Sequence, residues 1–208
     1  PSSQHGVTTV ILGNCGVGFA PCRPTDRERL IGVMEGVEDI PEVVMAEGLP
    51  WDWETFPDYL DALERRRRDI DVAAYVPHSA VRVYVMGERG AAREAATPAD
   101  LEKMQALVRS GMDAGAIGFA TSRQFIHRTH DGEMIPSFDV AEEELRLLVA
   151  AMGEDRGAFQ IVLDTPHLSW TDELNMLRRV LGSSGRTAMF TLGQGGTNPD
   201  DWRGALAI

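Results

Sequence analysis

The sequence predicts an α/β protein built on a parallel sheet. Short apolar runs rich in β-branched residues recur along the 208-residue chain, which is typical of strands buried on both faces. Segments with apolar residues at helical spacing separate them, so strand and helix alternate in about five units of roughly 30 to 45 residues, as right-handed βαβ units require. Such units fit either a partial (β/α)8 TIM-type barrel or a small doubly wound sheet, and the periodicity by itself leaves both open.

The expected strands are apolar runs that end at turn residues. The first, at residues 7–12, stops at a glycine-rich turn, and we expect it to be buried on both faces. The second, at residues 72–76, stops at Pro77, and a further short strand is expected at residues 81–85. The remaining strands are predicted at residues 116–119, 158–163 and 187–192.

The expected helices begin at recognisable start signals. Thr25, Thr55 and Thr97 are suited to N-cap positions, and Pro98 fits the first turn of the helix that follows Thr97. The predicted helices span residues 26–34, 56–67, 98–114, 141–152 and 171–181, with a last one beginning near Pro199.

A long polar loop is expected after the third main strand, at residues 120–139. A loop of this length inside a compact domain usually has a task, such as a lid or a binding surface. We expect its two histidines to be surface or lid residues, and its arginines to be candidates for binding a substrate carboxylate, since a guanidinium can do so with two hydrogen bonds. The residues concerned are Arg123, His127, Arg128, His130 and Asp131.

Composition places the chain among ordinary soluble globular proteins, with a net charge of −12. This charge argues against a nucleic acid or an anionic membrane surface as partner, because both require clustered cations. No apolar run approaches the length of a membrane span, and the chain as given contains no signal peptide. Cys15 and Cys22 could form a disulfide, but two cysteines in a chain of this size suit a reduced, cytoplasmic protein better. The chain begins without Met and ends inside a predicted helix, so we expect it to be part of a longer protein.

Cys15 lies in the glycine-rich turn that follows the first strand. A cysteine near a buried strand is most often a structural core residue. The turn at residues 13–18 is also loosely similar to a phosphate-binding loop, although its spacing is not G-x-G-x-x-G and no Lys-Ser/Thr follows. Since ligands and metals are handled at the carboxyl ends of strands in parallel α/β folds, a functional thiol is the third interpretation.

Four stretches of sequence resemble one family, in the family's order: HGVTTVILGNCGVGFAPCRP from His5, LPWDWETFPDYL from Leu49, RVYVMG from Arg82 and GAIGFATS from Gly115. They are similar to the N-acyl-D-amino-acid deacylases, or D-aminoacylases, a branch of the amidohydrolase superfamily. The resemblance implies that residues 1–208 form a single α/β region of a larger amidohydrolase barrel.

Amide hydrolysis at neutral pH needs an activated water and a polarised carbonyl, and a zinc ion can supply both. Zinc takes three or four Cys, His or carboxylate ligands, and the predicted strand ends offer Cys15, His78, Asp164 and His167. Each also has a plainer interpretation, as an exposed or turn-forming residue. The family resemblance implies zinc, one or two ions, with Cys15 and His167 among the ligands.

The same resemblance places the remaining functional groups outside this chain. A His-x-His pair would precede it, and a catalytic Asp and a substrate-binding Arg would follow it. A further metal-binding His is expected at the end of the fifth strand, where this chain has Leu192, Gly193 and Gln194 instead. The catalytic residues are therefore not assigned within residues 1–208, and we expect the isolated chain to be inactive.

The function that these expectations favour is metal-dependent hydrolysis of an N-acyl-D-amino acid to a D-amino acid and a carboxylate. One alternative is another amidohydrolase reaction, such as hydantoin or dihydropyrimidine ring opening. The other is a non-catalytic module in which the turn at residues 13–18 binds an anion. The expected partner is a small N-acylated amino acid, and the oligomeric state, a homo-oligomer included, is left open.

Overall fold

The computed structural model describes residues 2–154, 156–164, 168–182, 184–192 and 201–206. Its centre is a five-stranded parallel sheet in which the strands follow one another in chain order. The strands are β1 (Thr9–Leu12), β2 (Asp71–Pro77), β3 (Gly118–Ser122), β4 (Ala158–Val162) and β5 (Ala188–Phe190). The sheet confirms the predicted parallel α/β class.

The strands are staggered, and the stagger makes the sheet a curled half-barrel. The first part of β2, at residues 71–74, pairs with β1, whereas its last part, at residues 75–77, pairs with β3. Such a stepwise shift of register is what a sheet needs to close into a barrel. The fold is therefore part of a TIM-type barrel, and the doubly wound alternative is wrong.

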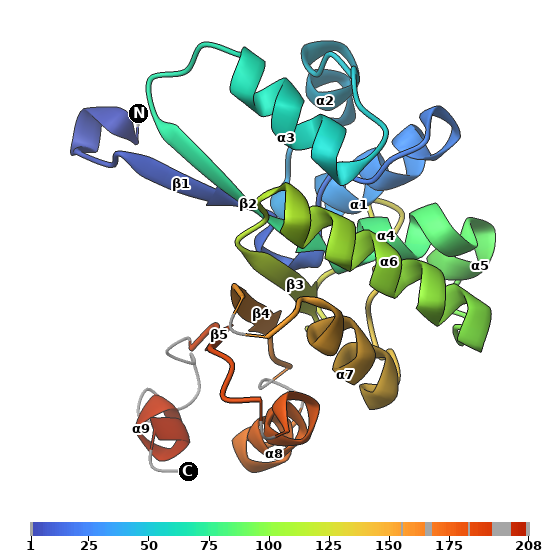
Figure 1. The fold of residues 1–208 in the computed structure, drawn as a ribbon, viewed down its shortest axis with the longest axis vertical. Coiled ribbons are helices and arrows are strands. Elements are labelled where there is room, and N and C mark those ends of the chain that lie inside the picture. The colour runs from blue at the N-terminus through green and yellow to red at the C-terminus, as the bar shows by residue number, and fades with distance from the viewer. Residues whose placement is uncertain (1, 155, 165–167, 183, 193–200, 207–208) are drawn as a thin grey trace.

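Helices cover the outer face of the curled sheet. They are α3 (Phe56–Arg65), α6 (Pro98–Ala114), α7 (Glu142–Ala151) and α8 (Trp170–Leu181). Each packs against the next around the outside (Figure 1). Val76, Phe119, Phe159 and Ile161 belong to the core between sheet and helices. Because side chains alternate along a strand, their neighbours Ala120, Ser122 and Gln160 face the inner side of the half-barrel.

Two of the predicted helix starts are confirmed in detail. Thr55 and Thr97 each accept a hydrogen bond from a backbone N–H three residues later, and an aspartate at that position bonds back to form a capping box. The predicted helix at residues 26–34 is α1 (Arg27–Glu38), and its N-cap is Asp26 rather than Thr25. α1 runs four residues past the predicted end, and it is followed by a helix that we did not predict, α2 (Glu42–Gly48).

The predicted strand at residues 81–85 is wrong, because this segment belongs to helix α4 (His78–Met86). Its three valines favour a strand in isolation. In the fold, Val81 and Val83 are buried on two sides of a helix, so packing overrides the propensity. The segment after α4 contains the short helix α5 (Glu88–Ala91), and the last described helix is α9 (Asp201–Leu206).

β1 is not buried on both faces as the sequence suggested. It pairs with β2 alone among the described strands, so it forms an edge of the sheet. Its residues alternate between exposed and half-buried, and Ile11 is 42% exposed on the inner face.

No helix in the described part of the chain is both long enough and apolar enough to cross a bilayer.

Candidate active site

The turn after β1 crosses the inner face of the half-barrel. It forms a short 3-10 segment, Asn14–Gly16, in which Cys15 has a φ of 64°. The backbone N–H of Cys15 donates to Oε1 of Gln160 on β4, at 3.0 Å. A Cβ on Gly16 would lie 2.5 Å from the carbonyl oxygen of Ala120 on β3, so only glycine fits there. The turn therefore holds Cys15 against β3 and β4, inside the curl.

The thiol of Cys15 is half-buried in apolar surroundings. It packs against a cluster of Val17, Val33 and Ile135, which joins α1 to the loop after β3. Burial, together with the negative charge of Glu38, raises the pKa of the Cys15 thiol to about 11. A thiolate at this position therefore requires a nearby cation.

The described residues do not by themselves complete a zinc site. Among them, no group of three or more His, Cys, Asp or Glu side chains is placed to hold a metal ion. Zinc requires three or four such ligands, so the described residues around Cys15 fall short of a complete set. His167, the second ligand that the sequence suggested, lies outside the described residues, as do Gly193 and Gln194.

His78 is not a strand-end ligand, because both its ring nitrogens are used on the helix side of the sheet. The imidazole is fully buried. Nδ1 lies 2.8 Å from the Thr121 hydroxyl, and Nε2 lies 2.9 Å from a carboxylate oxygen of Glu144. Arg82, also buried, donates to the same carboxylate at 2.6 Å. These residues form a structural network between α4, β3 and α7.

Burial lowers the pKa of His78, so the imidazole is neutral at neutral pH. It accepts the Thr121 hydroxyl proton at Nδ1 and donates from Nε2 to Glu144. For Glu144, burial by itself raises the pKa, but the hydrogen bonds and charges of His78 and Arg82 outweigh it and lower the pKa to about 2. Sequence reasoning missed this network, although Glu144 shares a helix face with Leu148 and Ala151, which marks it as a buried carboxylate.

Asp164 and Arg123 are tied together through a buried glutamate. Asp164, two residues after β4, accepts the backbone N–H of Phe125 and donates its own N–H to Glu173 on α8, at 3.0 Å. Arg123 donates from Nε to the other oxygen of Glu173, at 3.3 Å. The two predicted residues therefore help to join the carboxyl ends of β3 and β4 to the first turn of α8.

The long polar loop folds back over α1 and begins at residue 123, because β3 extends to Ser122. Arg128 donates to the carbonyl oxygen of Gly132 at 2.7 Å, and its guanidinium lies 4.5 Å from the ring centroid of Phe125. His130 is exposed, and its backbone N–H donates to the carbonyl oxygen of Gly32 on α1. His127 differs, because it is half-buried and bonded to Ser122.

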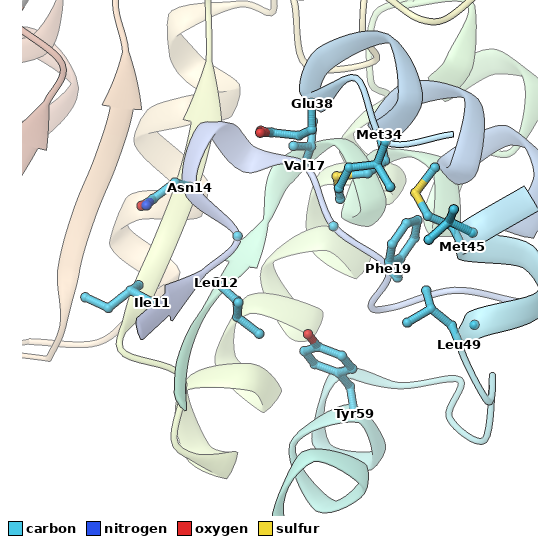
Figure 2. Close-up of a pocket in the computed structure, with 15 residues that line it drawn as sticks. Ile11, Leu12, Asn14, Val17, Phe19, Met34, Glu38, Met45, Leu49 and Tyr59 are labelled. Atoms are coloured by element: carbon cyan, nitrogen blue, oxygen red, sulfur yellow. The ribbon is translucent and has the colours of Figure 1, made fainter. Parts of the chain in front are cut away.

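An apolar hollow of about 670 Å³ lies beside β1. Figure 2 shows Leu12 and Ile11 on opposite sides of β1, with Tyr59 of α3 in the lower part of the view and Met34 of α1 towards the upper right. Asn14, Glu38 and the hydroxyl group of Tyr59 are the polar groups among its described lining side chains. The hollow adjoins the unpaired edge of β1. Cys15 and Cys22 are both free thiols in the structure.

The amidohydrolase family model matches residues 1–204. The chain belongs to the amidohydrolase family. Among curated relatives, the D-aminoacylase of Alcaligenes xylosoxydans xylosoxydans is 33% identical over 121 residues, which are 58% of this chain and 22% of the relative. The N-acyl-D-aspartate deacylase of the same organism is 33% identical over 123 residues, again 58% of this chain and 22% of the relative.

Solved structures of amidohydrolases share the fold. A D-aminoacylase variant in complex with copper chloride matches with a TM-score of 0.67 and 25% identity, over 95% of this chain and 37% of that one. The N-acyl-D-glutamate deacylase of Bordetella bronchiseptica, complexed with zinc and a phosphonate inhibitor, matches with a TM-score of 0.68 and 22% identity, over 99% of this chain and 39% of that one. The chain thus spans well under half the length of these relatives.

Proposed function

We propose that a protein containing this chain hydrolyses N-acyl-D-amino acids to a D-amino acid and a carboxylate. The observation that carries this proposal is the Cys15 turn, held on the inner face of an amidohydrolase half-barrel. That the curated relatives are D-amino-acid deacylases supports the substrate class.

We further propose zinc, one or two ions, as the cofactor, with Cys15 and His167 as ligands from this chain. Bound metal in the solved relatives, zinc in one and copper in another, supports a metal site. When bound, zinc would polarise the amide carbonyl and acidify a water molecule. Cys15 would then lose its proton, because the cation offsets the burial and the Glu38 charge that now keep the thiol protonated.

Arg123 and Arg128 are proposed to bind the substrate carboxylate. Arg128 is engaged by one backbone carbonyl and one aromatic face, so a carboxylate could replace the carbonyl without breaking an ion pair. Arg123 is paired with buried Glu173, so its use by a substrate requires that pair to open or to be shared. We therefore expect Arg128→Ala to raise KM more than Arg123→Ala raises it, in assays with N-acyl-D-amino acids.

The first experiment measures zinc content and zinc affinity for the wild type, Cys15→Ala and Cys22→Ala. Cys22 is the matched control, since its thiol is buried and donates to the backbone carbonyl of Arg23. We expect Cys15→Ala to lose zinc, in the full-length protein at least, and Cys22→Ala to retain it. Equal zinc binding by all three would contradict the role of Cys15.

A substrate panel on the full-length protein separates the proposed reaction from ring opening. N-acyl-D-amino acids, hydantoins and dihydropyrimidines are compared under the same metal conditions. We expect turnover of the first class, and none by the isolated 208-residue chain.

The anion-binding alternative gains no support, because the N–H groups of Cys15 and Gly16 are already bonded to Gln160 and Gly13. A cytoplasmic location and a homo-oligomeric state stay predictions from the sequence.

A further inference from the structure

Ser122 and His127 form a pair on the same face of the sheet as the Cys15 turn. Ser122 is the last residue of β3, and the alternation of the strand places its side chain inward, as it does for Ala120. The Gly16 backbone lies against Ala120 and Thr121. Ser122 is therefore the next residue of β3 beyond the point where the Cys15 turn crosses it.

The hydrogen bonds of Ser122 fix the tautomer of His127. The backbone N–H of Gln124 donates to the Ser122 hydroxyl oxygen at 3.1 Å. The hydroxyl proton is then free to point at Nδ1 of His127, which lies 2.7 Å away. Burial lowers the pKa of His127 and keeps the ring neutral. A neutral ring that accepts at Nδ1 carries its proton on Nε2, at the opposite side of the ring.

The proton on Nε2 has no acceptor among the described residues, where His127 bonds through Nδ1 to Ser122 and through its backbone N–H to Gln124. Ser122 itself is a poor nucleophile candidate, because it is fully buried and its oxygen already accepts from Gln124. The geometry therefore favours His127 as a neutral hydrogen-bond donor of fixed orientation. It does not favour Ser122 as a nucleophile with His127 as its base.

We infer that His127 is a catalytic residue that donates a hydrogen bond from Nε2 to an oxygen of the N-acyl amino acid. This inference rests on the proposed function and names one more group of the same site. The oxygen is either that of the acyl carbonyl or that of the α-carboxylate. A bond that strengthens as negative charge develops on the carbonyl oxygen lowers kcat when it is removed, whereas a bond to the carboxylate chiefly raises KM when it is removed.

The test compares His127→Leu, His127→Gln, Ser122→Ala and His130→Leu in the full-length protein. We expect His127→Leu to lower kcat/KM about 100-fold, as loss of one preorganised donor does. His127→Gln keeps an acceptor for Ser122 and a donor for the substrate, so it should recover most of the loss. Ser122→Ala should cost less than His127→Leu, since the ring stays but its tautomer is no longer fixed. His130→Leu, on the same loop, is the control and should match the wild type.

The outcomes separate the two proposals. If the wild type turns over N-acyl amino acids and His127→Leu does so equally well, the inference about His127 is overturned and the proposed function stands. A fall in melting temperature for His127→Leu without a change in kcat/KM has the same meaning, because the ring is then only structural. If the wild type has no such activity, both proposals fail. Covalent labelling of Ser122 by a serine-directed phosphonate, with loss of activity, would also overturn the donor role.

Discussion

Arg82 carries a positive charge into the layer between the sheet and its helices, where 1% of its surface reaches solvent. Glu144 supplies the balancing charge, and His78 and Thr121 occupy the remaining positions of the network. A buried ion pair of this kind contributes modestly while it is intact. Removing one partner is costly, because the other charge is left buried without compensation.

We therefore expect Glu144→Ala to destabilise the protein by about 3 to 5 kcal/mol. Glu143→Ala, one residue earlier on α7, is the matched control, because Glu143 pairs with Arg146 on the exposed side of the helix. Its free energy of unfolding should stay close to that of the wild type. Urea unfolding followed by circular dichroism measures both, and equal losses for the two variants would contradict the role assigned to Glu144.

The same network predicts a loss of stability in acid. His78 has a lowered pKa in the folded protein, so the unfolded chain binds its proton first, below the ordinary value near 6.5. Glu144 adds a second loss as the pH falls from its ordinary value of 4.5 towards about 2, for the same reason. His127 acts in the same direction as His78. The melting temperature should fall from about pH 6.5 downwards, and less steeply in His78→Gln; identical pH profiles would contradict this assignment.

At the scale of elements, two glycines of α1 allow the loop after β3 to pack closely against the helix. The hairpin at residues 128–134 lies across α1, and a Cβ on Gly36 would come within 2.2 Å of the Arg128 carbonyl oxygen. The loop is therefore held by close backbone contact and by the His130–Gly32 hydrogen bond. Through Ile135, the loop contributes to the apolar cluster that packs against Cys15.

Gly36→Ala should destabilise the protein by about 1 to 3 kcal/mol, since the overpacking exceeds the gain in helix propensity. Gly48→Ala, in α2, is the control, because an added Cβ there meets no atom within 4 Å. That variant should unfold at the same temperature as the wild type or slightly higher. Comparable destabilisation of both variants would show that packing against the hairpin is not the cause.

The sequence predicted elements best where local signals and packing agree. The threonine caps at Thr55 and Thr97 and the main strands follow from signals within a few residues. The strand prediction for residues 81–85 was wrong, because the fold buries these valines on a helix, and no local signal in the sequence shows that packing. At the site, the turn at Cys15 could be predicted, but its bond to Gln160 and the Ser122–His127 pair join distant or loop residues that have no periodic pattern.

At the scale of the whole molecule, the described sheet has two open edges, β1 and β5. The inner face is apolar near both, with Ile11 and Met189 exposed. Unpaired strand edges with apolar side chains promote association between chains. In the relatives, the aligned region is a minor part of a longer chain.

We expect the isolated 208-residue chain to self-associate with rising concentration, and Ile11→Lys to weaken this association several-fold. Sedimentation velocity over a range of concentrations measures the effect. Val43→Lys is the control, because Val43 is exposed on α2 and is not among the residues that line the hollow beside β1. If both lysines act alike, general charge rather than the edge of β1 is responsible.

The hydrogen bond between Cys15 and Gln160 joins residues that are 145 positions apart in the chain. The sheet pairings themselves join neighbouring units, and contacts of short sequence separation form faster because less chain entropy is lost. The first strand can therefore pair early, yet the turn that carries Cys15 reaches its final conformation only when β4 supplies Gln160 as hydrogen-bond acceptor. During synthesis the thiol of Cys15 is thus accessible to oxidants and metals long before its final surroundings exist.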